Sequence, residues 1–335
     1  MNPSELAEIG KTGLRVTRLG LGGAPLGGLF EGVSEEDAAA TVQAAYQAGV
    51  RFFDTAPFYG HGRSEARLGQ YLRPHPRDEF VLASKVGRIL VPTDPAHLED
   101  HRYRETLLFN PVFDFSQEGV LRSFEASLER LGLERIDILH LHDPDEYYRE
   151  ALSEAFPTLA RLREQGLIRA IGAGMNQWEM LARFAREADF DCFLLAGRYT
   201  LLDQSALPDL LPICLARKIS IILGGPYNSG ILASGSRGRG HYNYEAVPPE
   251  VLEKTRRIEA VCERHGVPLK AAALQFPLGH PAVAAVIPGA RSEAEVDENV
   301  AMLRHRIPGD LWQELRAEGL IRADAPALDV SPDSV

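Results

Sequence analysis

Residues 51–85 read RFFDTAPFYGHGRSEARLGQYLRPHPRDEFVLASK, and this stretch decides the fold. Two apolar runs, Arg51–Thr55 and Phe80–Ser84, flank a segment with helical spacing at about Ser64–Leu72. A strand, a helix and a second strand in this order form one unit of a parallel sheet. The number of such units along the rest of the chain indicates how many strands the sheet contains.

The same alternation extends in both directions along the chain. Six further strands are predicted at Arg18–Gly22, Ile136–His142, Ile168–Gly172, Cys192–Leu195, Ile219–Leu223 and Val283–Ile287. Further helices are predicted at about Ser34–Gly49, Gln117–Arg130, Arg149–Gln165, Asn176–Glu187, Ser205–Arg217, Pro249–His265 and Arg291–Leu303. Eight strands, each followed by a helix, favour an α/β fold closed into a (β/α)8 TIM barrel. An open doubly wound sheet is the alternative.

Four segments lie outside this alternation, and we expect residues 1–335 to form one domain around it. Residues 8–17 are expected to form a hairpin that plugs the bottom of the barrel. The insertion Gly87–Ser116 and the Gly- and Ser-rich loop Gly224–Val247 both follow strands. We therefore expect these long loops at the C-terminal face, where barrel active sites lie, and we expect the second to be mobile. The tail, about residues 322–335, is expected to be disordered.

The composition narrows the class of function. The chain is 45% hydrophobic and 25% charged, which is ordinary for a soluble protein. Its formal net charge of −11 makes nucleic acid and anionic membranes poor partners. It has no apolar segment typical of a signal peptide or a membrane span. The three cysteines, Cys192, Cys214 and Cys262, are far apart, which favours a reducing cytoplasm over a disulfide framework. The oligomeric state is not fixed by the sequence.

Polar side chains occur where three successive predicted strands end. Asp54 ends the second strand, and Tyr59 follows five residues later. Lys85 follows the third strand, and His142 ends the fourth. Consecutive parallel strands are usually neighbours, so we expect these four side chains to meet at the catalytic end of the barrel.

This combination suits proton transfer. A nearby ammonium lowers the pKa of a phenol from about 10, so Lys85 would activate Tyr59. Asp54 would pair with Lys85 and hold it in place. His142 would hydrogen-bond the substrate oxygen. The four side chains provide neither a nucleophile nor a metal, and hydride transfer to or from a nicotinamide cofactor would complete the reaction.

These residues also have structural and metal-binding interpretations. Taken alone, each of the four is more often a turn former, a solvated charge or a packing residue; together they favour function. His140 and His142 form an HxH pair on one face of a strand, as in metal-dependent hydrolases. Because the later strands end without further ligands, we predict no metal site and interpret His140 as a core histidine with satisfied hydrogen bonds. No GxGxxG motif opens a helix, so a Rossmann site is unsupported.

Several motifs together resemble the aldo-keto reductase superfamily over nearly the whole chain. They are GKTGLRVTRLGLG at 10–22, FFDTAPFYGHGRSEARLG at 52–69, VLASKVG at 81–87, IDILHLHDPD at 136–145, IRAIGAGMN at 168–176 and VIPGARSEAEVDEN at 286–299. The resemblance implies a nicotinamide-dependent oxidoreductase in which Tyr59 is the acid or base, with Asp54, Lys85 and His142 beside it.

The resemblance also implies the cofactor contacts, with Asn176 on the nicotinamide carboxamide and two later loops on the pyrophosphate and adenosine. The full predicted set is Gly23, Ala24, Asp54, Asn176, Gly225, Pro226, Tyr227, Asn228, Gly230, Ile231, Pro288, Gly289, Ala290, Arg291, Glu295, Glu298 and Asn299.

Three positions depart from the family pattern. Met175 stands where a serine is usual, Ala196 where a glutamine is usual, and Gly224 where an aromatic residue often stacks on nicotinamide. Tyr227 is the candidate replacement for that aromatic ring.

Glu295 predicts the choice of cofactor. Many family members carry an arginine at this position, which binds the 2′-phosphate of NADP. A carboxylate repels that phosphate and can accept a hydrogen bond from a ribose hydroxyl, so we predict NAD. Arg291 nearby leaves NADP open.

The segments GAPLGGLF (23–30), HDPD (142–145) and GRYTLLDQ (197–204) look closest to the sugar-oxidising group of L-fucose or D-threo-aldose, L-galactose and pyridoxal 4-dehydrogenases. This resemblance implies oxidation of an aldose at C1 to a lactone. Pyridoxal oxidation, general aldehyde or ketone reduction, and a non-catalytic cofactor-sensing subunit remain as alternatives. The insertion Gly87–Ser116 is expected to shape the substrate pocket.

Overall fold

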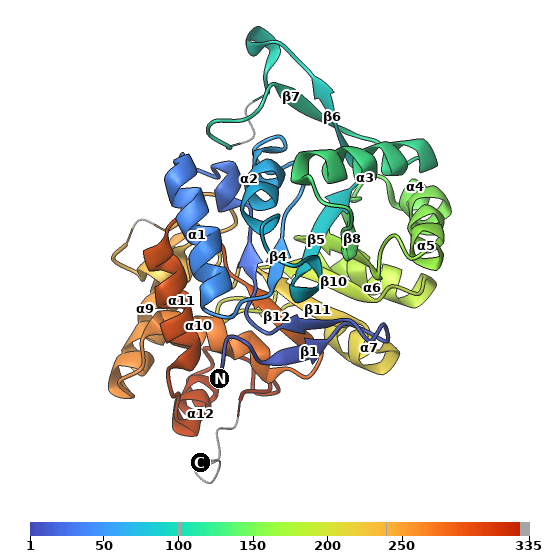
Figure 1. Cartoon of the computed structure of the whole chain (residues 1–335). Coiled ribbons are helices and arrows are strands. Elements are labelled where there is room, and N and C mark those ends of the chain that lie inside the picture. The colour runs from blue at the N-terminus through green and yellow to red at the C-terminus, as the bar shows by residue number, and fades with distance from the viewer. Residues whose placement is uncertain (100–101, 239, 329–335) are drawn as a thin grey trace.

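The computed structural model describes residues 1–99, 102–238 and 240–328 (Figure 1). Within them, one sheet contains eight parallel strands in the order β12-β11-β10-β9-β8-β5-β4-β3. These are β3 Leu21–Gly22, β4 Phe52–Asp54, β5 Val81–Val86, β8 Ile138–His142, β9 Ala170–Met175, β10 Cys192–Ala196, β11 Ser220–Gly224 and β12 Val283–Ile287. Parallel bridges from Leu19 to Val286 and from Gly22 to Gly289 join the first strand to the last. The predicted TIM barrel is confirmed, and the open doubly wound sheet is wrong.

Two strand ends differ from the prediction in a way that matters for the site. Lys85 was expected just after its strand, but β5 continues to Val86 and places Lys85 inside the barrel wall. The fifth strand was expected to end at Gly172, but β9 ends at Met175, so Asn176 directly follows it. Both strands are fully buried, and apolar periodicity alone does not mark the end of such a strand.

The helices surround the barrel, and each predicted helix is present with shifted ends (Figure 1). They are α1 Glu35–Gln47, α2 Arg63–Leu72, α3 Gln117–Leu131, α4 Tyr148–Glu150, α5 Phe156–Glu164, α6 Trp178–Glu187, α7 Leu210–Arg217, α8 Ile231–Ser234, α9 Pro249–Arg264, α10 Leu269–Gln275, α11 Glu293–Arg304 and α12 Gly309–Ala317. A short π-helix, Ala151–Ala155, joins α4 to α5. Sequence reasoning missed α10 and α12. No helix in the described residues is both long and apolar enough to cross a membrane.

The start of α1 shows how local sequence sets these elements. The Ser34 hydroxyl accepts a hydrogen bond from the Asp37 N–H at 3.0 Å, which satisfies one of the unpaired donors at the helix start. The Ser34 hydroxyl also donates to the Asp37 carboxylate at 2.7 Å. In a standard capping box, a glutamate three residues after the serine accepts from the backbone N–H of that serine. Here the shorter Asp37 side chain accepts from the Ser34 hydroxyl instead.

The N-terminal hairpin closes the bottom of the barrel, as predicted. Strands β1 Leu6–Glu8 and β2 Arg15–Thr17 pair antiparallel. Ile9 and Leu14, between them, are buried and pack with the apolar side chains that fill the barrel interior. The loops that follow the strands lie at the other end of the barrel. The hairpin thus shields this end of the barrel core from water.

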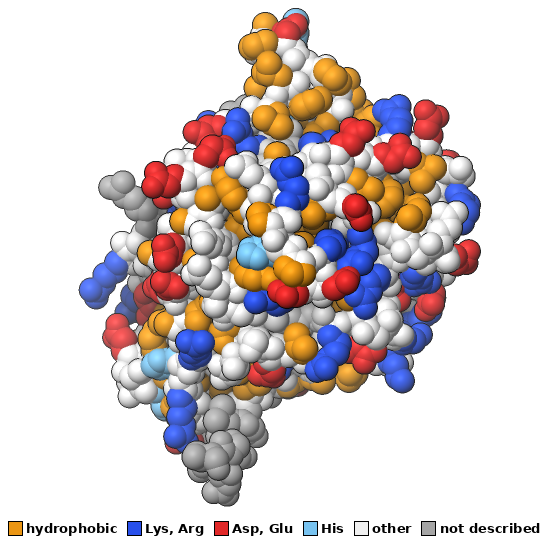
Figure 2. Space-filling view, viewed as in Figure 1, with side chains coloured by type: hydrophobic (Ala, Val, Ile, Leu, Met, Phe, Trp, Pro, Cys, Tyr) orange, Lys and Arg blue, Asp and Glu red, His pale blue; other side chains and the backbone are white. Residues whose placement is uncertain are grey.

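The insertion after β5 contains an antiparallel ribbon that sequence reasoning did not resolve. Strands β6 Arg88–Pro92 and β7 Phe109–Phe113 pair and project from the barrel on the side away from β1 (Figure 1). Hydrophobic side chains gather on this projection (Figure 2), where Val91 and Val112 are exposed. The segment that connects these two strands contacts the barrel loops, where Tyr103 forms an antiparallel bridge with Leu29.

The later loop and the tail are also described in part. Loop 225–247 contains α8 and folds back so that Tyr244 faces the C-terminal end of the barrel; its mobility stays a prediction. The tail begins later than we predicted, because Ala325 is buried and its carbonyl accepts hydrogen bonds from the Arg316 guanidinium. Residues 329–335 lie outside the described residues.

Candidate active site

Lys85 is anchored by three hydrogen bonds inside the barrel. Its Nζ donates to Asp54 Oδ1 at 3.0 Å, to Asp54 Oδ2 at 2.8 Å and to the Thr55 carbonyl at 2.9 Å. An ammonium has three donors, so all of them are used. Lys85 is 1% exposed and Asp54 2%, and such a pair persists in the interior only when its hydrogen bonds are complete. Burial raises the pKa of Asp54, and the charge of Lys85 opposes this shift.

Two glycines of β9 make room for the side chains of the neighbouring strands. A Cβ on Gly172 would lie 2.1 Å from His140 Nδ1, and one on Gly174 would lie 3.4 Å from Lys85 Cε. In parallel register, Lys85 stands opposite His140, and His142 stands opposite Gly174. The GAG segment at 172–174 therefore determines which side chains the barrel interior can hold.

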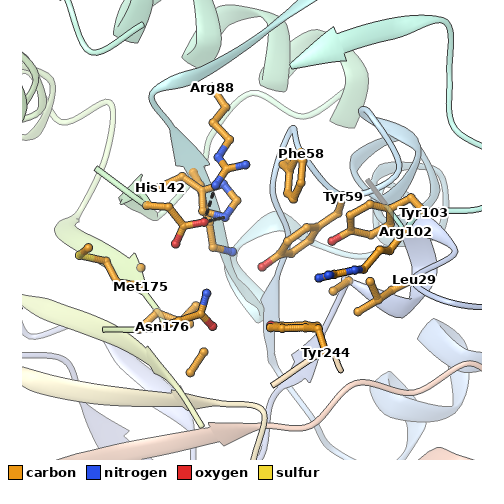
Figure 3. Close-up of a pocket in the computed structure, with 16 residues that line it drawn as sticks. Leu29, Phe58, Tyr59, Arg88, Arg102, Tyr103, His142, Met175, Asn176 and Tyr244 are labelled. Atoms are coloured by element: carbon orange, nitrogen blue, oxygen red, sulfur yellow. Dashed lines mark hydrogen bonds and ion pairs between the residues drawn. The ribbon is translucent and has the colours of Figure 1, made fainter. Parts of the chain in front are cut away.

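Tyr59 follows β4, and its side chain points into a cavity that Lys85 also lines (Figure 3). Lys85 Nζ lies 4.6 Å from the centre of the Tyr59 ring. Burial raises the pKa of the Tyr59 hydroxyl well above its ordinary value, and the charge of Asp54 adds to this. Our expectation that Lys85 would bring this pKa down is not met, because burial dominates and the ammonium is paired with Asp54. Tyr59 is therefore a neutral phenol, able to donate a proton.

His142 faces Tyr59 across the cavity. The two rings are perpendicular, with their centres 5.9 Å apart. His142 is 6% exposed, and burial, with the positive charge of Arg88, lowers its pKa well below the ordinary value. Nε2 lies 3.7 Å from Asp143 Oδ2, while the buried Nδ1 has no hydrogen-bond partner in the described chain. A neutral imidazole at this place can donate one hydrogen bond to a substrate oxygen.

His140 is a core histidine, but the predicted satisfaction of its hydrogen bonds is wrong. It is fully buried, and within the residues that the structure describes neither ring nitrogen has a partner. Burial and the nearby Lys85 lower its pKa, so the ring is neutral. Among the described residues, no group of three or more His, Cys, Asp or Glu side chains could hold a metal ion.

A cavity of about 490 Å³, a size suited to a small organic ligand, is lined by only some of the predicted residues; Asp54 and the predicted residues of the two later loops do not line it. Tyr59, Lys85 and His142 line it together with Ala24 and Asn176. Sequence reasoning did not assign several other lining residues, which are Leu29, Phe58, Arg88, Arg102, Tyr103, Asp143, Met175, Leu194, Ala196 and Tyr244. Figure 3 shows Arg88 descending from above toward His142, and Tyr103 and Tyr244 beside Tyr59.

Comparisons with known proteins agree with this geometry. The aldo/keto reductase family model matches residues 18–318. The chain belongs to the aldo/keto reductase family. It is 41% identical to pyridoxal 4-dehydrogenase of Microbacterium luteolum, over 96% of this chain and 99% of that protein. It is 42% identical to D-threo-aldose 1-dehydrogenase of a Pseudomonas species, over 92% and 96%.

Among solved structures, the holo form of the aldo-keto reductase AKR11C1 from Bacillus halodurans has the same fold. It superposes with a TM-score of 0.75 and 22% identity, covering 98% of this chain and 99% of that one. As an aldo/keto reductase, the protein is an oxidoreductase that uses a nicotinamide cofactor, and the predicted family and enzyme class are confirmed.

The expected cofactor loops of this aldo/keto reductase fit such a group. Gly225, Asn228, Ser229 and Gly230 all have positive φ, so the backbone arches at the mouth of the barrel. Asn228 is buried; its Nδ2 donates to the Gly197 carbonyl, but its Oδ1 has no partner in the described residues. Across the mouth, a Cβ on Gly289 would lie 2.5 Å from Pro25 Cγ, so only glycine allows this close approach.

Tyr227, the candidate for stacking on nicotinamide, does not line the cavity with Tyr59. Its ring is 9% exposed, its hydroxyl donates to Asn299 Oδ1 at 2.7 Å, and Lys270 Nζ lies 5.3 Å from the ring centre. Lys270 also forms an ion pair with Glu298. These residues are joined to one another beside α11 and do not line the cavity with Tyr59.

Arg291 is held between two carboxylates at the start of α11. Its guanidinium pairs with Glu31 and, at 3.3 Å, with Glu295. Its backbone N–H also donates to Glu295 Oε2 at 2.9 Å. The positive charge that could attract a phosphate here is thus compensated by Glu31 and Glu295.

Proposed function

We propose that this aldo/keto reductase oxidises an aldose at C1 to a lactone, with NAD as the hydride acceptor. The observation that carries the proposal is that Tyr59, Lys85 and His142 line one cavity, while Asp54 hydrogen-bonds Lys85 and holds it there. The similarity to D-threo-aldose 1-dehydrogenase supports the sugar as substrate. The buried free cysteines suit the reducing cytoplasm that we propose as its compartment.

The residues would divide the chemistry as follows. His142 donates a hydrogen bond to the C1 oxygen and fixes it beside the Tyr59 hydroxyl. Tyr59 removes the proton of the C1 hydroxyl, and in the reverse direction returns a proton to the carbonyl oxygen. Lys85 places its charge against the Tyr59 ring, and Asp54 keeps Lys85 in that position. The bound nicotinamide supplies the chemistry that a side chain cannot, the acceptance of a hydride from C1.

Asn176 would bind the nicotinamide carboxamide, because its amide lines the cavity and no described residue hydrogen-bonds it. Loop 225–231 and residues 288–292 would hold the pyrophosphate and adenosine. The two carboxylates on Arg291 favour NAD over NADP, since a 2′-phosphate would have to displace Glu295 and overcome its repulsion.

Pyridoxal oxidation is the second candidate. It is favoured by the aromatic wall of the cavity, because Tyr103 lies with its ring centre 6.1 Å from that of Tyr59 and 5.4 Å from that of Phe58. Such a wall would pack against a flat pyridine ring. The similarity to pyridoxal 4-dehydrogenase supports this alternative.

A spectrophotometric screen decides between the two. Purified protein is assayed at 340 nm with L-fucose, L-galactose, D-arabinose, pyridoxal and simple aldehydes, each with both oxidised and both reduced cofactors. We expect NAD-dependent oxidation of an aldose, with lactone as product. Turnover of pyridoxal alone would support the second candidate, and failure with every sugar would remove the first. Tyr59→Phe is the control: it should lose turnover yet bind NADH, as measured by fluorescence.

A further inference from the structure

Arg88 and Asp143 form a charged pair in the wall of the cavity, outside the four residues already assigned. Arg88 Nη2 donates to Asp143 Oδ2 at 2.5 Å. The side chains are 14% and 22% exposed, and both line the cavity. A charged pair this deeply placed must lose hydration, so it is weak evidence of added stability and calls for another role.

The surroundings fix the direction of both side chains. The Arg88 guanidinium lies 4.3 Å from the centre of the Phe58 ring and 4.5 Å from that of Phe113. Asp143 adopts a φ of 45°, which is unusual for a residue other than glycine, and its N–H donates to the Gly174 carbonyl at 3.0 Å. Backbone strain of this kind occurs mainly at functional sites.

The pair retains unused hydrogen-bonding capacity. Arg88 Nε is buried without a partner in the described residues. The hydrogen bonds found in the described chain use one carboxylate oxygen of Asp143 and one terminal nitrogen of Arg88. Donors and acceptors held side by side suit hydroxyl groups, because a hydroxyl can accept from a guanidinium and donate to a carboxylate.

The position of the pair relative to His142 indicates which hydroxyl it meets. Asp143 Oδ2 lies 3.7 Å from His142 Nε2, and Nε2 is the ring nitrogen available to the substrate oxygen, because Nδ1 is buried. This distance puts Asp143 within reach of a group on the carbon beside the reacting carbon. Figure 3 shows Arg88 on the side of His142 away from Asn176.

We propose that Arg88 and Asp143 recognise the hydroxyl on the carbon adjacent to the reacting carbon, and so select α-hydroxy substrates such as aldoses over plain aldehydes. This inference rests on the proposed function in that Tyr59 and His142 hold the reacting oxygen. It explains how a cavity with an aromatic wall discriminates in favour of a polyol.

The test compares substrates that differ by this one hydroxyl. The ratio of kcat/KM is measured for L-galactose against 2-deoxy-L-galactose in oxidation, and for glycolaldehyde against acetaldehyde in reduction. We expect the wild-type protein to prefer the hydroxylated member by roughly 10- to 100-fold, as for a hydrogen bond to a charged group. Asp143→Asn should reduce that preference by about 10-fold.

A single substitution leaves the partner charge buried and unpaired, which itself destabilises the protein, so a double variant is also needed. Arg88→Met with Asp143→Leu removes both charges together and should erase the preference while keeping a cooperative thermal transition. Asp94→Asn, in the same insertion but exposed and outside the cavity, is the matched control and should keep the wild-type ratios. If the pair only fastens the ribbon to the barrel, the double variant should have a lower melting temperature and unchanged kcat/KM ratios.

The outcomes separate the inference from the proposed function. In the first outcome, no aldose is oxidised, but glycolaldehyde is still preferred in reduction and the double variant loses that preference. This result would contradict the proposed aldose dehydrogenase activity and support recognition of the hydroxyl by Arg88 and Asp143. Aldose oxidation without a preference for the hydroxylated member would overturn the recognition and support the dehydrogenase. Retention of the wild-type ratios in the double variant would also overturn the recognition.

Discussion

Tyr59 shows how strongly burial competes with a neighbouring charge. Lys85 lies under its ring, yet the pKa of Tyr59 is raised, because burial disfavours the phenolate and Asp54 cancels the ammonium. His142 is neutral for the related reason that burial and nearby cations lower its pKa. At the residue scale, the site therefore holds one acid, Tyr59, and one neutral hydrogen-bond donor, His142.

These directions predict the pH dependence of kcat/KM, which reports groups of the free enzyme. Oxidation needs Tyr59 without its proton, and a raised pKa keeps the proton on; kcat/KM for oxidation should therefore rise with pH up to about 10. Reduction needs the protonated form and should stay level over the same range. Neither profile should bend near pH ~6.5, because His142 is already neutral there.

The measurement is steady-state kinetics in both directions in overlapping buffers, with activity at neutral pH rechecked after each exposure. A plateau of the oxidation profile below pH ~9 would mean that Lys85 does lower the pKa of Tyr59 in the working enzyme.

Glu295 carries the second prediction at this scale. Glu295→Arg removes one of the two carboxylates on Arg291 and places a cation where a 2′-phosphate would lie. We expect the ratio of kcat/KM for NADP to that for NAD to rise by roughly 10-fold or more, as for a new charge-assisted hydrogen bond. Glu293→Arg, in the same first turn of α11 but not bonded to Arg291, is the matched control. An unchanged ratio in Glu295→Arg would remove Glu295 as the selector.

Sequence reasoning found the residues whose position in a strand signals function and missed those whose role depends on contacts distant along the chain. Asp54, Lys85 and His142 break apolar runs, so the pattern exposes them. Arg88 begins a ribbon that the pattern did not resolve, and Tyr244 comes from a loop with no periodicity. Asp143 was visible in the HDPD motif but gained meaning only when its ion pair to Arg88 was seen.

At the scale of elements, β9 sets how much the barrel interior can hold. Gly172→Ala would place a Cβ 2.1 Å from His140 Nδ1 and 2.9 Å from the Cys192 carbonyl. Overpacking of this kind typically costs about 1–3 kcal/mol in the free energy of unfolding. Gly174→Ala is the matched control on the same strand, because its nearest contact would be an ordinary 3.4 Å.

Urea unfolding measures both variants. His140→Ala in the Gly172→Ala background should recover part of the loss, since the nearer of the two clashes disappears. Equal stability of Gly172→Ala and Gly174→Ala would contradict the packing argument.

At the scale of the molecule, the two ends of the barrel have different tasks. Eight repeated units gave a strong signal for the barrel, because each unit repeats the same two periodicities. The ribbon β6–β7 and helices α10 and α12 gave weaker signals, since short elements depend on tertiary contacts rather than on their own pattern. We infer that the whole chain folds as one domain, closed below by the hairpin and open above at the cavity.

This division predicts that the bottom of the barrel controls stability and leaves catalysis alone. Leu14 is 1% exposed and packs within the barrel interior from the hairpin side. Leu14→Ala should lower the free energy of unfolding by about 2–5 kcal/mol, because it leaves a cavity that a rigid barrel cannot collapse around. At temperatures where the variant stays folded, kcat and KM should equal those of the wild-type protein. Leu6→Ala, on the same hairpin but 43% exposed, should change neither quantity measurably. A fall in kcat of folded Leu14→Ala would show instead that packing at the hairpin reaches Lys85 and the cavity through the barrel interior.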